Sequence, residues 1–358
     1  MKNTHSKLLL LLAMPALLLI PVKAQNNNQI QSKFDFVPGE KVIFYDDFNS
    51  ENIGDFPAQW TTNGSGEVVT STKFAGRWFN ITKEGYFMPD VSPEFTENFT
   101  IEFDIVPSNI INKENAFGIS YFFLSGDRTV PGYGSQPGMA GMVFEPGYDR
   151  VTWRNWSQAK EWQGDDGAVS FTFKSTEKYH ISLWVQKQRV RVYVNENKIL
   201  DLPNGLQKGY IYNIFRIETT SESNPLIGNF RIAAGLPDMR NKLLTDGKII
   251  SYGIQFDVNS DKVKPESYAT IKEIAQVLKD NPTVKVKIVG HTDSDGDNAA
   301  NLDLSKRRSI SVKKELADKF AIETGRIETD GKGETEPLAT NDNQLNKAKN
   351  RRVEIIKL

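Results

Sequence analysis

The spacing of apolar residues changes near residues 236–247, and this change is the strongest constraint on the fold. Before it, short segments such as residues 99–105 alternate apolar and polar residues with a period of two, which is typical of half-buried strands. After it, segments such as residues 265–278 show helical spacing and alternate with strand-like runs. A chain of 358 residues is also too long for one ordinary core. The sequence therefore predicts an N-terminal domain at residues 40–235, a linker at 236–247 and a C-terminal domain at 248–358.

The N-terminal domain is predicted to be an all-β jelly-roll sandwich. Apolar residues at 180–185 and 190–194 flank the polar pair Lys187-Gln188, which predicts a hairpin. Turns rich in Gly, Pro and Asn separate the strand-like segments, above all at residues 131–138. Many of these segments are shorter than the roughly 9–11 residues that a membrane-spanning strand needs. A sandwich is therefore favoured, and an integral outer-membrane β-barrel is the alternative.

The C-terminal domain is predicted to be an α+β unit, with helices on one face of a mixed sheet in the order β/α/β/α/β. The expected strands are residues 249–256, 284–289, 326–331 and 352–356, and the expected helices are residues 265–278, residues 299–320 and a short one near Leu345. In the first helix, the spacing of Tyr268, Ile271 and Ile274 predicts one buried face.

Residues 1–24 have the composition of a signal peptide. Two lysines precede an apolar stretch at residues 8–20, and small residues stand before a cleavage point after Ala24. At roughly 13 residues the apolar stretch is too short for a permanent transmembrane anchor. Residues 25–39 are rich in Asn and Gln and are predicted to be a disordered lead-in.

The composition argues against several classes of function. The net charge of −1 gives no basic surplus for a nucleic-acid partner. Because the chain has no cysteine, it has no disulfide, no thiolate metal site, no cysteine nucleophile and no lipid-modified cysteine. We therefore expect an exported protein without a cofactor.

Residues 288–308 are the most informative segment, because a buried-looking strand leads there through an acidic loop into a helix. Three alternating aspartates, beginning at Asp293, first suggest calcium. However, Asn298 and Leu304 stand where an EF-hand loop needs glycine and glutamate, so no metal site is expected. No serine, carboxylate and histidine set is evident around His291, which is expected to have a structural position at the strand end.

Asp293 and Arg308 instead suit a zwitterionic ligand. Asn301, Ser305 and Arg308 are spaced by four and three residues, so they lie on one helical face. A carboxylate at the strand end facing this row would accept hydrogen bonds from an ammonium group, while the guanidinium binds a carboxylate in bidentate fashion. The alternative is that Asp293 and Arg308 form an ordinary surface ion pair with each other.

Five sequence blocks in this half of the chain keep the order and spacing of a known family. They are Gly290-His-Thr-Asp-Ser-Asp-Gly296, Asn301, Leu304-Ser-Lys-Arg-Arg308, Gly331-Lys-Gly-Glu-Thr-Glu-Pro337 and Asn350-Arg-Arg-Val-Glu354. Through these blocks, residues 248–358 resemble the OmpA C-terminal family, the peptidoglycan-binding domain shared with Pal-type lipoproteins and with MotB-type flagellar stator proteins.

The resemblance implies non-covalent binding of the diaminopimelate in the stem peptide of peptidoglycan. Carried over residue by residue, it places the ligand-binding Asp at Asp293 and the ligand-binding Arg at Arg308, with Asn301 as a supporting polar contact. It also implies that the pocket is shaped by Thr292, Leu304, Ser305 and Arg352. Ser309 is a mild departure, since the family often has Ala after the ligand-binding Arg.

The sandwich resembles the concanavalin-like and laminin-G-like groups only through its strand pattern. Glu102-Phe-Asp104 begins like the catalytic strand of jelly-roll glucanases, but no second glutamate follows, so hydrolysis is not expected. Trp153, Trp156 and Trp162 suit either a sugar-stacking surface or the packing of a core, and the packing interpretation is favoured.

Together these features predict a non-enzymatic protein of the periplasm and cell envelope, which its C-terminal domain anchors to the cell wall. The combination is similar to two-domain OmpA-family proteins of Bacteroidetes type. The sandwich is expected to contact a glycan or an envelope protein, and a peripheral association with the outer membrane is compatible with the sequence. The alternative is a carbohydrate-binding or glycan-degrading sandwich that the C-terminal domain merely localises.

Overall fold

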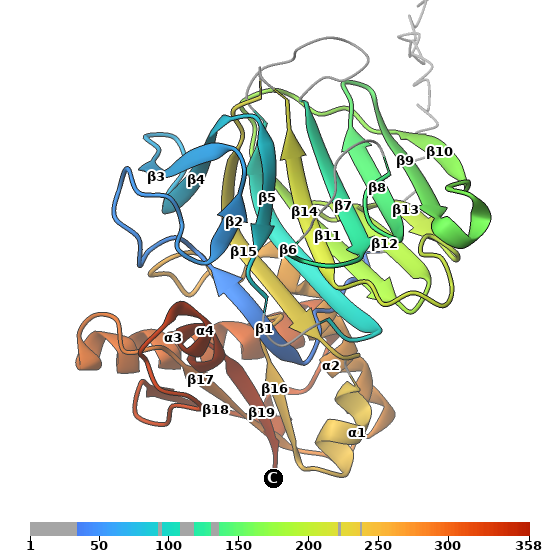
Figure 1. The fold of residues 1–358 in the computed structure, drawn as a ribbon. Helices are drawn as coiled ribbons and strands as arrows, with labels where there is room; N and C mark the ends of the chain where they lie inside the picture. Colours follow the sequence, from blue (N-terminus) through green and yellow to red (C-terminus); the bar gives the residue numbers. More distant parts are fainter. Residues whose placement is uncertain (1–33, 92–94, 108–117, 130–135, 221–222, 237) are drawn as a thin grey trace, which may run out of the picture. The chain divides into compact units, whose positions relative to one another are not determined.

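Two antiparallel β-sheets, packed face to face, account for residues 41–234 of the computed structural model (Figure 1). The structure describes residues 34–91, 95–107, 118–129, 136–220, 223–236 and 238–358. Three sequence predictions therefore fall wholly or partly outside the described residues: the signal peptide at 1–24, the lead-in up to residue 33, and residues 131–135 of the long turn.

The first sheet has eight strands and faces the C-terminal domain with one side. The strands are β1 (Lys41–Asp46), β3 (Ser65–Thr70), β4 (Arg77–Lys83), β6 (Asn98–Val106), β11 (Tyr179–Gln186), β12 (Arg189–Val194), β13 (Asn197–Leu202) and β15 (Leu226–Ala234). They run in the order β13-β12-β11-β6-β15-β4-β3, and β1 pairs with β15. The predicted hairpin is confirmed, because β11 and β12 pair with Gln186 opposite Arg189.

The second sheet has seven strands and covers the other side of the core. The strands are β2 (Trp60–Thr62), β5 (Gly85–Pro89), β7 (Ile119–Ser125), β8 (Ala140–Pro146), β9 (Arg150–Ser157), β10 (Asp166–Ser170) and β14 (Ile214–Thr219). They run in the order β10-β9-β8-β7-β14-β5-β2, and a short 3-10 helix, η1 (Gln158–Lys160), follows β9.

The sandwich core is aromatic and lies between the two sheets. Phe103 of β6 stacks on Phe230 of β15 with ring centroids 5.6 Å apart, and both belong to the buried cluster that joins the sheets. Because side chains alternate along a strand, Glu102 and Asp104 point to the opposite face of β6. The predicted sandwich is confirmed, and its polar outer face is directed at the C-terminal domain.

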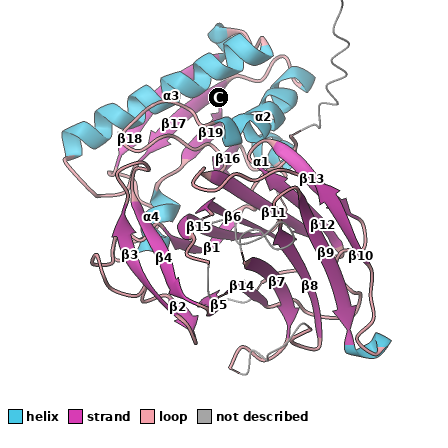
Figure 2. Cartoon of the chain, turned by 90° about the horizontal axis from the view of Figure 1, so that it is seen from above, coloured by secondary structure: helices cyan, strands magenta, loops and turns pink. Residues whose placement is uncertain are grey.

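The C-terminal domain combines a four-stranded mixed sheet with helices, as predicted. Its strands are β16 (Lys248–Ser251), β17 (Val286–His291), β18 (Ile327–Gly333) and β19 (Val353–Lys357), and its helices are α1 (Met239–Leu244), α2 (Tyr268–Asp280), α3 (Asn298–Phe320) and α4 (Gln344–Asn350), with 3-10 turns η2 (Pro265–Ser267) and η3 (Thr324–Arg326). The sheet order is β16-β19-β17-β18; β17 and β18 are parallel, and the other pairs are antiparallel. Helices α2 and α3 lie side by side and share one apolar core with the sheet (Figure 2).

Two local expectations for this domain are corrected. The strand expected at residues 249–256 ends at Ser251, and Phe256 forms only an isolated bridge with Val263. The chain leaves the sheet after Ser251, because the backbone carbonyl of Tyr252 accepts a hydrogen bond from Arg231 of the sandwich instead of pairing with a strand. Tyr268, expected on the buried face of α2, is 40% exposed, since it lies at the first turn of that helix.

The described end of the lead-in is packed rather than disordered. Phe34 and Phe36 are buried, and their rings contact Tyr193 on the outer face of the first sheet at centroid distances of 5.6 and 5.5 Å. Phe36 also contacts Trp184 edge to face. Two large aromatic side chains bury enough apolar surface to order a short segment, which composition alone did not indicate.

Candidate functional site

The loop between β17 and α3 is held at the strand ends because α3 approaches the sheet very closely. A Cβ atom on Gly290 would lie 2.3 Å from the carbonyl oxygen of Ser305 in α3, and one on Gly331 would lie 2.4 Å from the Ser305 hydroxyl. No other residue fits at these two positions without moving the helix. The Ser305 hydroxyl also accepts a hydrogen bond from the Gly333 amide, so Ser305 joins α3 to β18.

The loop itself is fixed by two of the predicted polar residues. Asn301 donates to the carbonyls of Asp293 and Asp295, at 3.3 and 3.1 Å, and to Glu334 at 2.7 Å. The Thr292 hydroxyl donates to the carbonyl of Asp293 at 2.8 Å. Asn301 and Thr292 therefore orient Asp293 rather than offering free groups of their own.

Asp293 directs its carboxylate at an arginine that the sequence analysis did not select. One oxygen accepts from the amide of Asp295 at 3.1 Å, and the other lies 2.5 Å from Nη1 of Arg351. The Asp293 side chain is 10% exposed, so this charge is largely removed from bulk water. A carboxylate held by one amide and one guanidinium still has lone pairs for a further donor.

Arg308 lies on α3 and is fixed mainly by carbonyl oxygens. Its Nε donates to the carbonyl of Ser260 at 3.0 Å, Nη2 reaches the carbonyl of Asp257 at 3.5 Å, and the guanidinium lies 4.9 Å from the ring centre of Phe256. Burial lowers the pKa of Arg308 to about 10, against the opposing effect of Asp293. Among the described residues, no hydrogen bond reaches its Nη1.

Asp293 and Arg308 line one cavity of about 340 Å³ but are not an ion pair with each other in the described structure. Asn301 and Leu304 line the same cavity, as do Thr292 and Arg352, whereas Ser305 contributes the hydrogen bond to β18 described above. The alternative that Asp293 and Arg308 simply neutralise each other is therefore not what the structure contains. The ligand-binding role of all seven predicted residues stays a prediction.

The two neighbouring arginines after α4 have different surroundings. Arg352 is 4% exposed and donates to Glu354 at 2.8 Å and to the carbonyls of Asn350 and Glu336. Its charge is thus used inside the domain. Arg351 projects into the cavity lined by Asp293 and Arg308, hereafter called the cleft, and pairs there with Asp293. The double arginine of the Asn350-Arg-Arg-Val-Glu354 block was the signal for Arg351, but sequence alone does not say which of the two faces the cleft.

The opposite wall of the cavity belongs to the sandwich. Tyr45 of strand β1 lines it, as does Asp47, the first residue after this strand. Helix α4 packs beside β1. The Arg351 guanidinium lies 4.8 Å from the ring centre of Tyr45, and its Nη2 lies 3.6 Å from Asp47. Although burial disfavours the cation, Tyr45, Asp47 and Asp293 together raise the pKa of Arg351 above its ordinary value.

Four buried charges on the outer face of the first sheet, here called the sheet cluster, line the same cavity: Glu102, Asp104, His180 and Arg231. Strand register places Arg231 opposite Glu102 and His180 opposite Asp104. The Nε of Arg231 donates to Glu102 at 3.0 Å, and Nδ1 of His180 lies 2.8 Å from Asp104. Burial favours a neutral ring, but Asp104 and Glu102 raise the pKa of His180 to about 9.

His291 is buried at the end of β17, where the acidic loop begins. Burial, followed by the charge of Arg352, lowers the pKa of His291 to about 4, so its ring is neutral at pH 7. Neither ring nitrogen has a hydrogen-bond partner among the described residues. Within the same residues, no group of three His, Cys, Asp or Glu side chains is placed to hold a metal ion.

The three tryptophans considered for sugar stacking do not form one exposed surface. Trp156 is fully buried and packs edge to face on Phe122, Trp153 packs against the sandwich core, and Trp162 is 39% exposed. The packing interpretation therefore holds for Trp153 and Trp156. The indole of Trp156 donates to the carbonyl of Pro137, which satisfies its polar atom.

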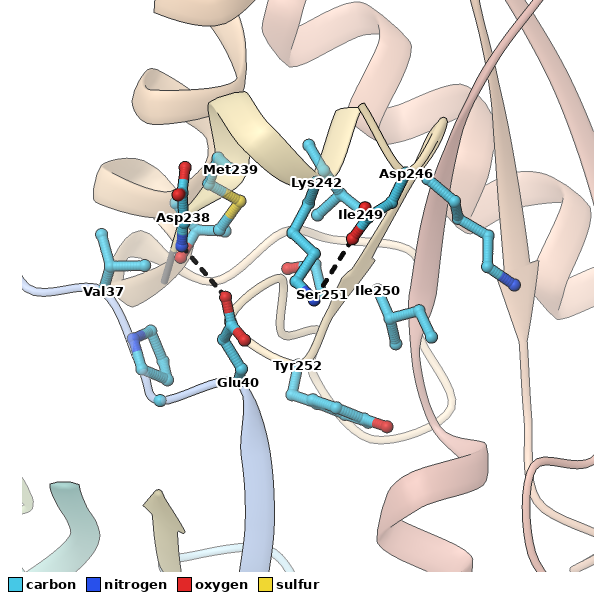
Figure 3. A pocket seen from close by; sticks show the side chains of 15 residues that line it. Val37, Glu40, Asp238, Met239, Lys242, Asp246, Ile249, Ile250, Ser251 and Tyr252 are labelled. Carbon is cyan, nitrogen blue, oxygen red and sulfur yellow. Dashed lines mark hydrogen bonds and ion pairs between the residues drawn. The ribbon is translucent and has the colours of Figure 1, made fainter. Parts of the chain in front are cut away.

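A second cavity of about 320 Å³ lies between residues 37–40 and the α1–β16 region. Figure 3 shows Glu40 directed at the backbone amide of Asp238, to which it is hydrogen-bonded at 3.0 Å, and Lys242 paired with Asp246 at 3.4 Å. These charges have partners within the wall, and the hydroxyls of Ser251 and Thr270, which also line this cavity, are uncharged groups without a hydrogen-bond partner among the described residues.

Comparisons with known proteins match the C-terminal domain. Residues 255–351 match the model of the OmpA family. Over 105 residues the chain is 40% identical to the outer membrane porin F of Pseudomonas aeruginosa, covering 29% of this chain and 30% of the porin. The chain thus spans less than a third of the length of that relative. Among the described residues, no helix has the length and apolar character that crossing a membrane requires.

Solved structures resemble the two domains separately. The peptidoglycan-associated lipoprotein from Burkholderia pseudomallei is 25% identical with a TM-score of 0.29, and covers 34% of this chain and 100% of that one. The carbohydrate binding module CBM66 from Bacillus subtilis is 14% identical with a TM-score of 0.34, and covers 49% of this chain and 96% of the module. Scores this low say nothing about the site. The sequence match over residues 255–351 confirms the resemblance noted above: the C-terminal domain is an OmpA-family domain, joined here to an N-terminal β-sandwich.

Proposed function

We propose that the C-terminal domain binds peptidoglycan non-covalently, through the zwitterionic end of a diaminopimelate residue, and thereby holds an exported envelope protein to the cell wall. The observation that carries this proposal is the arrangement of Asp293 and Arg308. They line one cavity, do not pair with each other, and keep a carboxylate lone pair and a guanidinium arm for a ligand.

The chemistry of the ligand matches this arrangement. Diaminopimelate presents an ammonium and a carboxylate on the same carbon, so one end of the molecule needs both an acceptor and a donor. Asp293 supplies the acceptor and Arg308 the donor. The resemblance to the OmpA C-terminal family supports the same ligand, and a relative that is named as an outer membrane porin supports a place in the periplasm beside the outer membrane.

We propose a binding role without catalysis for the whole chain. The acidic pair in the sandwich, Glu102 and Asp104, is already bound by Arg231 and His180. Burial raises the pKa of both carboxyls, but the charges and hydrogen bonds of these partners outweigh it and keep both pKa values below their ordinary range. Neither group is therefore a proton donor at pH 7, which a glycosidase acid must be.

Co-sedimentation of the full chain with purified diaminopimelate-type sacculi tests the proposal. We expect Asp293→Ala and Arg308→Ala each to weaken binding about 30-fold or more, since losing one partner of a desolvated charged contact costs about 2–5 kcal/mol. The matched controls are Asp303→Ala and Arg307→Ala, exposed residues of the same helix that pair with each other at 2.8 Å. They should bind like the unaltered chain.

Competition experiments identify the ligand group. Free meso-diaminopimelate should displace the sacculi, whereas pimelate, which lacks both amines, and cadaverine, which lacks both carboxylates, should not. Equal binding by all four variants, or displacement by pimelate alone, would rule out the zwitterion site.

A further inference from the structure

The ligand site is not confined to the OmpA-family domain, because the sandwich contributes the wall that faces Arg351. Asp47 follows β1 directly, and its side chain is only 11% exposed. Its Oδ2 atom lies 3.6 Å from Nη2 of Arg351, and the Tyr45 hydroxyl lies 3.4 Å from the same carboxylate. The guanidinium thus lies between a carboxylate of each domain: Asp47 on the sandwich side and Asp293 on the other.

Around Arg351, the charges of Asp293, Arg308 and Arg351 are balanced by one carboxylate of the sandwich. Arg308 and Arg351 carry two positive charges, and Asp293 carries one negative charge, so the OmpA-family domain alone leaves one positive charge in excess. Asp47 supplies the second negative charge. These four charges sum to zero and suit a zwitterion: the ligand ammonium pairs with Asp293, the ligand carboxylate with Arg308, and Arg351 with Asp47.

Arg351 also competes with the proposed ligand for one carboxylate. Its Nη1 contacts the Asp293 oxygen that a ligand ammonium would approach. Its other arm, Nη2, has an ionic partner in Asp47 but no hydrogen bond among the described residues. Without Asp47, Asp293 would be the only carboxylate that Arg351 contacts, and the ammonium would meet a neutralised partner.

We infer that Asp47 of the sandwich is a positioning residue for ligand binding: it offers Arg351 a second carboxylate, to which the guanidinium turns when the ammonium group of the ligand binds Asp293. This inference rests on the proposed peptidoglycan site. It makes the sandwich part of that site, so ligand affinity depends on the contact of Asp47 with Arg351.

Single and double variants of the full chain test the inference by titration against purified sacculi. Asp47→Asn should bind about 5- to 20-fold more weakly, which is the lower part of the range for coupled sites. Asp47→Glu should recover most of this loss, because a longer carboxylate can still reach Nη2 across the 3.6 Å contact. The control is Asp166→Asn, an exposed aspartate of the second sheet, which should leave binding unchanged.

Removing the competing arginine supplies the decisive readout. Arg351→Met should bind at least as well as the unaltered chain, and Asp47→Asn combined with Arg351→Met should bind within about 2-fold of it, since Asp293 is then free again. A role of Asp47 in folding alone predicts no such rescue.

The other possible outcomes overturn either the role of Asp47 or the proposed function. If Asp47→Asn binds sacculi normally, or if Arg351→Met fails to rescue it, the inference is wrong while the proposed function stands. A loss in Arg351→Met as large as that in Arg308→Ala would make Arg351 a direct ligand contact, which also overturns the inference. If the unaltered chain does not bind sacculi, the proposed function itself fails.

Discussion

Two groups of charged residues line the same cavity, and they differ in how completely their charges are paired with counter-charges. In the sheet cluster, every member is at most 8% exposed, and each charge lies directly across a strand pair from its counter-charge. The cleft cluster consists of Asp47, Asp293, Arg308 and Arg351. Here Arg308 is fixed by carbonyl oxygens instead of a carboxylate, and Arg351 is shared between two domains.

The difference separates charges that hold the structure together from charges that remain available to a ligand. Glu102 also accepts a hydrogen bond from Gln255, and Arg231 donates to the carbonyl of Tyr252, so the sheet cluster joins the sandwich to the C-terminal domain. Each of its charges lies against a buried counter-charge. In the cleft cluster, Arg308 has no ion-pair partner among the described residues, and a charged pair that is not neutralised internally, in a concave site, is what a small zwitterion needs. Variants of the sheet cluster should therefore lose stability, and variants of Asp47, Asp293 and Arg308 in the cleft cluster should lose ligand affinity.

The largest loss of stability is expected from Arg231→Met. It leaves Glu102 buried at 2% exposure with His180 as its one cationic partner in the described part of the chain, and breaking a buried ion pair costs about 3–5 kcal/mol. Urea unfolding should show this loss, while sacculi binding in the absence of urea stays within about 2-fold. The matched control is Arg189→Met, which breaks a half-exposed pair with Asp201 and should cost no more than about 1 kcal/mol. A loss of binding without a loss of stability would contradict the division between the two clusters.

A pH titration of stability should detect the next largest effect. The pKa of His180 is raised from 6.5 to about 9, so its protonation stabilises the folded state fully below pH 6.5, and this contribution is lost as the pH rises through 9. The shift corresponds to a decrease on the order of 3 kcal/mol between these limits. His180→Gln should remove the decrease over that window. A free energy of unfolding that is flat from pH 6.5 to 9 in the unaltered chain would mean that His180 is not charged in the fold.

Replacing Arg351 and Arg352 one at a time should show the same contrast in stability between two adjacent residues. Arg352→Met should cost about 2–3 kcal/mol of stability, because it leaves Glu354 and two carbonyl oxygens without their buried donor. Arg351→Met, whose side chain is 28% exposed, should cost less than about 1 kcal/mol. Thermal unfolding of the two variants under one set of conditions checks the order. Equal losses would show that Arg351 is as structural as its neighbour.

The smallest effect is expected at the acids of the loop outside both clusters. Asp295 pairs with Lys347 at 2.7 Å, but its side chain is 60% exposed. Asp295→Asn should change stability by no more than about 0.5 kcal/mol and leave sacculi binding unaltered, since the backbone amide that holds Asp293 is retained. Thermal unfolding and co-sedimentation measure both quantities, and a clear loss of binding would mean that the ligand reaches beyond the cleft cluster.

Local patterns predicted most of the secondary structure. Helix α3 was expected at residues 299–320 and spans Asn298–Phe320, because helical spacing and a capping aspartate, Asp297, are local features. The β11–β12 hairpin was predicted for the same reason. The length of strand β16 was overestimated, because Tyr252 and Gln255 form hydrogen bonds with the sandwich instead of continuing the strand. The spacing of apolar residues within a segment does not indicate such a distant partner.

The sequence by itself determined which segment forms the candidate site and which residue types it presents. The motif around residues 290–308 places an aspartate at a strand end and an arginine on the following helix, and these relations depend only on neighbouring residues. Tertiary structure alone decided that Arg351, and not Arg352, faces the cleft, and that Asp47 meets it from another domain. The physical reason is that burial and ion pairing are set by how separate sheets dock, and no periodicity within one segment encodes that contact.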